Sequence, residues 1–267
     1  MQPLTARLVT YGIRDGQHNM AIDEHLLLRH GHAGEPVLRL YGWSPPSITL
    51  GRYQKIECLD RDACRSEGVS VVRRITGGGA IFHDDELTYS VVWPAGDREN
   101  PGSAAGSFKK LNAFIMETYR SLGMKPVYSR DAGRESSAGR VNFCFSGNEE
   151  YDILVGGKKI GGNAQRRVRG ALLQHGSMPF SVDSARAQRY FRDPIEHRNF
   201  TALREACDRE IGIEELARAV TDAFCAVMGV DCTVRELDDS EEENVRSIAR
   251  NRYSSEQWTV TGAGDEV

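Results

Sequence analysis

Two adjacent arginines and three consecutive glycines form the sequence feature with the clearest chemical potential. They lie in the run Arg73-Arg74-Ile-Thr-Gly77-Gly78-Gly79-Ala-Ile-Phe-His83-Asp84. Glycines let backbone N–H groups approach an anion without a Cβ atom in the way, and arginine binds carboxylate or phosphate through paired hydrogen bonds. The run therefore predicts an anion cradle, although a glycine-rich turn with solvated arginines would use the same residues. It is neither a Walker P-loop nor a dinucleotide-binding G-x-G-x-x-G loop.

A lysine followed by small residues is the second candidate, in the run Lys159-Ile-Gly-Gly162-Asn-Ala164. A lysine at a strand end can direct its ammonium at a polarised carbonyl or a phosphate, and small neighbours leave room for a ligand. A surface lysine at a hairpin is the alternative, since most lysines are exposed.

Strands are expected to position both runs. Four short segments rich in β-branched or aromatic residues are bounded by Gly and Pro, and each predicts a strand: 37–43, 47–51, 69–74 and 87–93. Glycines at 156–157 predict a hairpin that leads into Lys159, and residues 171–178 continue the sheet.

Helices are expected before and after these strands. The first covers Met20 to Leu28 with Asn19 as its cap, the second runs from Ser107 to a stop at Gly123, and the third ends at Gly229. A shorter charged helix is expected over 239–253. Strands first and helices later predict an α+β domain over residues 1–235, with a C-terminal helical extension over 236–267.

Composition narrows the class of protein. The 267 residues are 40% hydrophobic and 27% charged, as in ordinary globular chains, and fit one large domain or two small ones. A net charge of −4 gives no general attraction to nucleic acid. No apolar run approaches the roughly 20 residues of a membrane span, so we expect a cytoplasmic protein without a membrane partner. The six cysteines include no C-x-x-C pair, which argues against a metal cluster.

The two runs together resemble the catalytic domain shared by lipoate-protein ligases, octanoyltransferases and biotin-protein ligases. The lipoate branch is matched from about Asn19 to Trp258, with R-R-x-x-G-G-G-x-x-x-H-D at 73–84 and K-x-x-G-x-A at 159–164. Gln174-His175-Gly176-Ser177 is similar to the strand that follows the lysine motif. The resemblance implies a mixed sheet flanked by helices, and an acyl chain in a tunnel whose carboxyl end lies near the lysine.

By this resemblance, Lys159 is the catalytic residue that contacts the acyl carbonyl and stabilises the charge developing there. Arg73 is expected to hold the glycine loop, and His83 with Asp84 to shape its far end, unless that histidine forms only a structural pair. The resemblance implies further substrate- or nucleotide-binding residues: Gly77, Gly78, Gly79, Gly162, Ala164 and His175.

The family uses two activation chemistries to place an eight-carbon acyl group on one lysine of a lipoyl domain or an H-protein-like acceptor. Ligases convert free lipoate or octanoate to an acyl-adenylate with ATP and Mg, whereas octanoyltransferases take the group from acyl carrier protein through a cysteine thioester and need no cofactor. Gly79 leaves space for a nucleotide, so a lipoate-protein ligase is the expectation. An accessory subunit is a further partner to consider, since some related ligases carry a second domain as a separate protein.

The octanoyltransferase is the alternative, and it depends on Cys144. This thiol lies 15 residues before Lys159, where the transferases carry their nucleophile. A buried hydrophobic role is the other reading of such a cysteine. A non-catalytic lipoyl-domain binding protein ranks third, because Lys159 and the glycine loop are both present.

Overall fold

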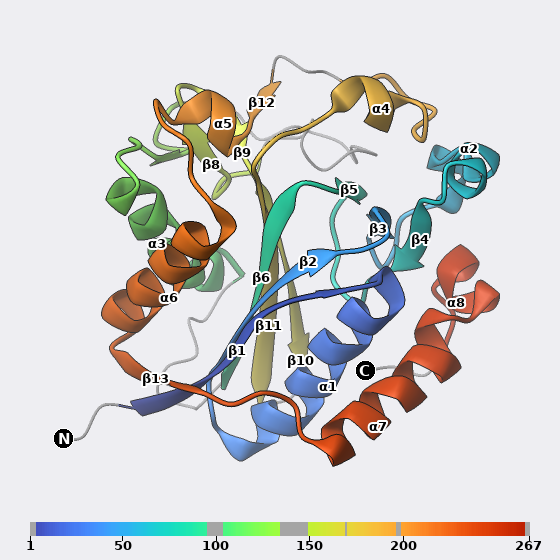
Figure 1. The fold of residues 1–267 in the computed structure, drawn as a ribbon, viewed down its shortest axis with the longest axis horizontal. Coiled ribbons are helices and arrows are strands. Elements are labelled where there is room, and N and C mark those ends of the chain that lie inside the picture. The colour runs from blue at the N-terminus through green and yellow to red at the C-terminus, as the bar shows by residue number, and fades with distance from the viewer. Residues whose placement is uncertain (1–3, 95–103, 134–148, 169, 196–198, 265–267) are drawn as a thin grey trace.

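A six-stranded mixed sheet forms the centre of the protein (Figure 1), in the strand order β10-β11-β6-β2-β1-β13. The structure, a computed structural model, describes residues 4–94, 104–133, 149–168, 170–195 and 199–264. Strand β1 pairs in parallel with β2 and β13, and the remaining pairs are antiparallel. The strands are β1 (Leu4–Arg14), β2 (Val37–Trp43), β6 (Glu86–Pro94), β10 (Gly162–Val168), β11 (Ala171–Pro179) and β13 (Val230–Val234).

Helices cover both faces of this sheet (Figure 1). Helices α3 (Ala104–Ser121) and α6 (Ile213–Met228) lie on one face, and α1 (Gly16–Ala33) with α7 (Asp239–Ile248) on the other. Side chains alternate along a strand, so Leu38 and Leu40 of β2 join the α3–α6 core, whereas Val37 and Tyr41 join the α1 core. The expected α+β fold with a mixed sheet and flanking helices is confirmed.

Two smaller sheets hold the two sequence motifs. One has the order β4-β3-β5, from Ser70–Arg73, Ser47–Leu50 and Ile81–His83, and carries the glycine loop between β4 and β5. The other has the order β12-β9-β8-β7, from Phe200–Thr201, Lys158–Ile160, Ile153–Val155 and Val127–Tyr128. The short helical segments are η1 (Ile56–Cys58), α2 (Arg61–Ser66), α4 (Ser184–Gln188), α5 (Leu203–Ala206), η4 (Ala249–Tyr253) and α8 (Glu256–Thr261).

The turn and the helix ends that glycines predicted from the sequence are confirmed. Gly156 and Gly157 have positive φ angles of 58° and 78° at the β8–β9 turn, and Gly123 and Gly229 adopt positive φ where α3 and α6 end. Residues other than glycine rarely adopt these backbone conformations.

The first helix begins earlier than expected. Asp15 is its N-cap and accepts a hydrogen bond from the His18 amide. Asn19, the predicted cap, instead lies inside the helix, fully buried, and donates to the Gly42 carbonyl 3.0 Å away. Asparagine suits a cap or a buried polar contact equally well, so the residue type did not decide between them.

The C-terminal helices pack onto the rest of the chain. Val245, Ala249, Tyr253 and Trp258 are buried in the same apolar cluster as α1. Because these helices share a core with α1, the expected boundary at residue 235 between a domain and a C-terminal extension stays a prediction. Among the described residues, no helix combines the length and the apolar character needed to cross a membrane.

Candidate active site

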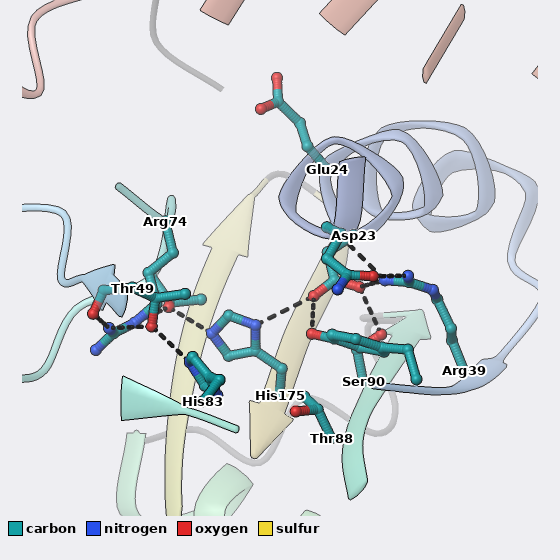
Figure 2. Close-up of polar contacts among 12 residues, drawn as sticks. Asp23, Glu24, Arg39, Thr49, Arg74, His83, Thr88, Ser90 and His175 are labelled. Atoms are coloured by element: carbon teal, nitrogen blue, oxygen red, sulfur yellow. Dashed lines mark hydrogen bonds and ion pairs between the residues drawn. The ribbon is translucent and has the colours of Figure 1, made fainter. Parts of the chain in front are cut away.

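Three neighbouring strands direct polar side chains at one carboxylate on α1 (Figure 2). Asp23 Oδ1 accepts from Arg39 Nη1 and Ser90 Oγ, each at 2.8 Å. Its Oδ2 accepts from Tyr41 OH at 2.9 Å and lies 3.1 Å from His175 Nδ1. All five side chains are buried. Polar groups persist at such depth only when they are hydrogen-bonded, and this cluster meets that condition.

The protonation states in this cluster follow from burial and charge. Burial opposes ionisation of Asp23, but the His175 hydrogen bond and the Arg39 charge hold its pKa below the usual range. Burial lowers the pKa of His175, despite the nearby carboxylate. His175 is therefore neutral near pH 7, and its Nδ1–H donates to the ionised Asp23 because a carboxylate only accepts. Nε2 then accepts from Thr76 Oγ1, 2.7 Å away in the glycine loop.

A second relay of the same form lies at the other side of the loop. His83 Nδ1 lies 2.9 Å from Glu86 Oε1, and its Nε2 lies 2.9 Å from Thr49 Oγ1. The imidazole stacks on Trp43, with ring centroids 4.0 Å apart. Burial opposes ionisation of Glu86, but the His83 charge and the hydrogen bonds it receives lower its pKa. Ser177 Oγ supplies one of those bonds, at 2.7 Å.

Arg74 joins the two relays and fixes the glycine loop. Its Nε donates to Thr76 Oγ1 at 3.1 Å, and its Nη1 donates to Thr49 Oγ1 at 3.1 Å. Its Nη2 donates to the carbonyls of Gly77 at 2.6 Å and Gly79 at 2.7 Å. One fully buried guanidinium thus spans the loop and both histidine relays, a task that suits the planar fork of arginine.

Several predicted site residues are not among those that line the pocket: Asp84, Arg73, Lys159 and the three glycines 77–79. Asp84 does not pair with His83: strand β5 ends at His83, and the Asp84 carboxylate instead accepts from Arg186 Nη1 at 2.6 Å. Arg73 donates to main-chain carbonyls behind the glycine loop, among them Gly51 at 2.8 Å. Among the described residues, the side chain of Arg73 thus binds segments behind the glycine loop, and the carbonyls of the loop itself are bound by Arg74, not by Arg73 as the resemblance implied.

A pocket with about 280 Å³ of empty space lies between the relays and α1. Met20, Trp43 and Ile81 contribute apolar walls. Gly162 and Ala164 of the lysine motif line it as well, together with both relay histidines. The structure thus brings the predicted His83, His175, Gly162 and Ala164 to one cavity.

Lys159 lies on β9, three positions before Gly162, and is buried. Its Nζ forms an ion pair with Asp152 Oδ2 at 2.7 Å. Asp152 also lines an open depression with about 550 Å³ of empty space, beside Asn112 and Asn163. Cys144 lies outside the described residues. The buried ion pair rejects the alternative of a surface lysine.

Comparison with known proteins places these residues in a family. Residues 15–225 match the family described as "Lipoyl protein ligase A/B catalytic domain". The chain belongs to this family. It is an enzyme of the lipoate ligase and octanoyltransferase group, and the resemblance drawn from the two motifs is confirmed.

Relatives named "Octanoyltransferase LipM" are similar over almost the whole chain. The protein from Symbiobacterium thermophilum is 34% identical, covering 95% of this chain and 97% of its own length. The protein from Halalkalibacterium halodurans is 32% identical, covering 95% and 98%. These names favour the octanoyltransferase alternative over the ATP-dependent ligase that Gly79 indicated.

Solved ligases of the lipoyl protein ligase A/B family share the fold. The crystal structure of lipoate-protein ligase A bound with ATP superposes with a TM-score of 0.81 at 25% identity, covering 97% of this chain and 99% of that one. A bipartite lipoate protein ligase from Thermoplasma acidophilum gives a TM-score of 0.80 at 23% identity, a likeness of fold alone, over the full length of both chains.

Sequence reasoning missed several polar residues of this family member's pocket. Asp23, Arg39, Thr88, Ser90 and Glu86 are buried in it or beside it. A signal was present, because Arg39, Thr88 and Ser90 occupy alternate positions of strands whose other residues are mostly apolar. A polar face on an otherwise buried strand needs hydrogen-bond partners and indicates a site.

Proposed function

We propose that this protein is an octanoyltransferase. It moves an octanoyl group from acyl carrier protein to one lysine of a lipoyl domain or an H-protein-like acceptor, through a thioester at Cys144. The similarity to proteins named octanoyltransferase, at 32% identity across 95% of this chain, carries the proposal. The route needs no nucleotide.

The pocket supports an acyl substrate. Ligand pockets are lined mostly by apolar side chains with a few polar groups that fix orientation, and the lining of this pocket has that composition. Met20, Trp43 and Ile81 offer apolar contacts along it. Burying each methylene of a hydrocarbon chain there contributes about 0.8 kcal/mol. An eight-carbon chain therefore gains most of its affinity from these walls.

The use of Arg74 also favours a route without a nucleotide. A triphosphate needs positive charge that is free to pair with it. Arg74, the only arginine among the residues that line the described pocket, donates from all three nitrogens to the loop carbonyls and the two threonines. Its charge holds the loop, and taking up a phosphate would break those bonds.

The reaction balances as two acyl exchanges. In the first, the Cys144 sulfur bonds to the octanoyl carbon and the carrier thiol leaves with the proton that Cys144 gives up. In the second, the acceptor amine forms an amide and a proton returns to the Cys144 sulfur. Lys159, whose Nζ lies 2.7 Å from Asp152 Oδ2, stabilises the oxyanion formed in each step.

A lipoate-protein ligase using ATP and Mg is the second candidate. The similarity to a lipoate-protein ligase bound with ATP, at 25% identity, is the observation in its favour. Gly77, Gly78 and Gly79 would line the adenylate in that case, and Lys159 would meet its phosphate. Neither step of the proposed octanoyl transfer uses ATP or Mg.

The test is acylation of an apo lipoyl domain, followed by intact mass. Octanoyl-acyl carrier protein is one donor, and free octanoate or lipoate with Mg-ATP is the other. We expect transfer from the carrier only, and its loss in Cys144→Ala. Cys232→Ala, a half-buried thiol on β13, is the matched control and should retain activity. Acylation that requires ATP and survives Cys144→Ala would instead establish the ligase.

Lys159→Ala tests the role of Lys159 in the reaction, and its Tm is measured in parallel because the variant also leaves the buried Asp152 without this ion pair. Removing one oxyanion donor commonly costs about 10²- to 10³-fold in kcat. We expect a loss of at least that size, measured as the single-turnover rate of acceptor octanoylation. Asp152→Asn retains the size of its side chain but removes the carboxylate charge 2.7 Å from Lys159 Nζ. It should lower the rate less than Lys159→Ala does, and near-normal turnover of the Lys159 variant would reject the assignment.

A further inference from the structure

We propose that residues 249–262, here named the C-terminal brace, are a positioning element of the acyl pocket. The brace comprises η4, α8 and Gly262. It is attached behind two segments beside the pocket, here named the arms: the glycine loop at residues 74–80 and the part of α1 at residues 19–24. Trp258 and Tyr253 are its positioning residues. The inference rests on the proposed function only in assigning the pocket to an acyl group.

The first attachment is at Arg73, whose guanidinium is buried behind the glycine loop. Its Nε donates to the carbonyls of Trp258 at 3.1 Å and Thr259 at 3.0 Å, and its Nη2 donates to Val260 at 2.9 Å. In return, Trp258 Nε1 donates to the Arg73 carbonyl at 2.8 Å. Arg73 and Trp258 are therefore tied in both directions, across 185 positions of sequence.

The chemistry of a helix end explains this attachment. The last carbonyls of a helix have no partner within it and carry the negative end of its dipole. Helix α8 ends at Thr261, and Gly262 with a φ of 67° closes it. The carbonyls of 258–260 accept hydrogen bonds from the buried Arg73 guanidinium, and that of Trp258 also accepts from the Gly262 amide. The remaining Arg73 bonds, to the carbonyls of 51–54, tie the same cation to the β3 end.

The second attachment is at Glu24 of α1. Tyr253 OH donates to Glu24 Oε2 at 2.7 Å, and Arg252 Nε lies 3.3 Å from the same oxygen. Glu24 is buried. Figure 2 shows its side chain on the opposite side of α1 from the Asp23 network. The brace thus binds α1 at the residue that follows Asp23, whose carboxylate orients His175.

Each attachment point is the chain neighbour of a pocket residue. Arg73 precedes Arg74, the hub of the glycine loop, and Glu24 follows Asp23. Inside the pocket, the Thr76–His175 hydrogen bond of 2.7 Å is the polar link between these arms. One such bond is worth only about 0.5 to 1.5 kcal/mol. The brace adds a further connection between the same two segments, beside the packing of α1 on β4 and the Ser70–Gln17 hydrogen bond of 3.3 Å, and so helps to fix the spacing on which the relay depends.

Two conservative variants test the brace: Tyr253→Phe removes a single oxygen, and Trp258→Phe replaces a buried indole by a smaller ring. Trp258→Phe removes the indole donor to Arg73, and Tyr253→Phe removes the hydroxyl bound to Glu24. Glu256→Gln is the matched control, because among the described residues its carboxylate pairs with Arg61, and its side chain is 67% exposed. Amide hydrogen exchange of residues 74–80 and 19–24 reports the arms directly, whether or not the protein transfers octanoyl groups.

We expect faster exchange of 74–80 in Trp258→Phe and of 19–24 in Tyr253→Phe, with β6 and β11 unchanged and Glu256→Gln like the parent protein. A misplacement near 1 Å can cost about 100-fold in rate, so kcat should fall about 10- to 100-fold in the double variant while the KM for the acceptor domain stays within about twofold. Unchanged exchange in both arms, or a lowered Tm with kcat intact, would overturn the brace. A parent protein inactive with octanoyl-acyl carrier protein would reject the function alone.

Discussion

Replacing Asp23 with asparagine would remove the single negative charge on which four buried donors converge. Arg39 and Asp23 are 2.8 Å apart, with side chains 3% and 2% exposed. An asparagine offers one acceptor oxygen in place of two and turns an NH₂ group toward donors. Arg39 would keep its charge in a buried site without a compensating carboxylate.

The cost can be worked from this geometry. Removing one partner of a buried ion pair costs about 3 to 5 kcal/mol. For a chain of this size class each kcal/mol lowers Tm by about 2 to 4 °C, so Asp23→Asn should lower it by about 6 to 20 °C. Differential scanning calorimetry at pH 7.5 measures the shift.

Asp84→Asn is the matched control, since it makes the same chemical change in an exposed pair. Asp84 and Arg186 are 2.6 Å apart, but their side chains are 39% and 27% exposed. Exposed pairs contribute about 0 to 1 kcal/mol, so Tm should fall by no more than about 4 °C. If the two variants lower Tm equally, the argument that Asp23 anchors the pocket is wrong.

Three further outcomes are expected. Gly161→Ala should lower Tm by more than Gly157→Ala. Both glycines have a positive φ, which costs alanine about 1 to 2 kcal/mol, but at Gly161 the added Cβ would also overlap the Ser177 carbonyl oxygen, whereas at Gly157 it meets no neighbouring atom. The free energy of unfolding in urea should decrease below pH 6.5, because burial lowers the folded-state pKa of His175 from 6.5 and the unfolded chain then binds more protons; His175→Gln should flatten that slope. Arg74→Lys should slow octanoyl transfer at least about 100-fold, because an ammonium with three donors cannot hold both loop carbonyls and both threonines. Stopped-flow acylation measures this rate.

Local rules predicted the parts of this fold that local chemistry decides. The Gly156–Gly157 hairpin and the helix stop at Gly229 follow from positive φ angles, and the structure has both. The lysine and glycine motifs were recognisable because each keeps a fixed spacing within one segment. Their partners were not, because Asp152 and Lys159 meet across a hairpin and His83 pairs with Glu86 rather than Asp84.

Long-range pairing explains what the sequence could not provide. Strand β1 gave no alternation of apolar and polar residues, since it is buried over Ala6–Val9 and exposed at both ends. Arg73 seemed suited to an anion, yet its partners are carbonyls contributed by a helix 185 positions away. Nothing within a window of ten residues indicates such a contact.

The pairing of β1 also sets the order in which the chain can mature. Leu4 of β1 pairs with Val230 of β13, and Arg7 pairs with Glu241, which is 234 positions later. A ribosome adding about 5 to 20 residues per second needs roughly 12 to 47 seconds to make that stretch. Throughout that time the outer edge of β1 has no strand to pair with, and exposed edges attract other chains. Synthesis of β13 therefore ends the interval in which the outer edge of β1 is open to aggregation.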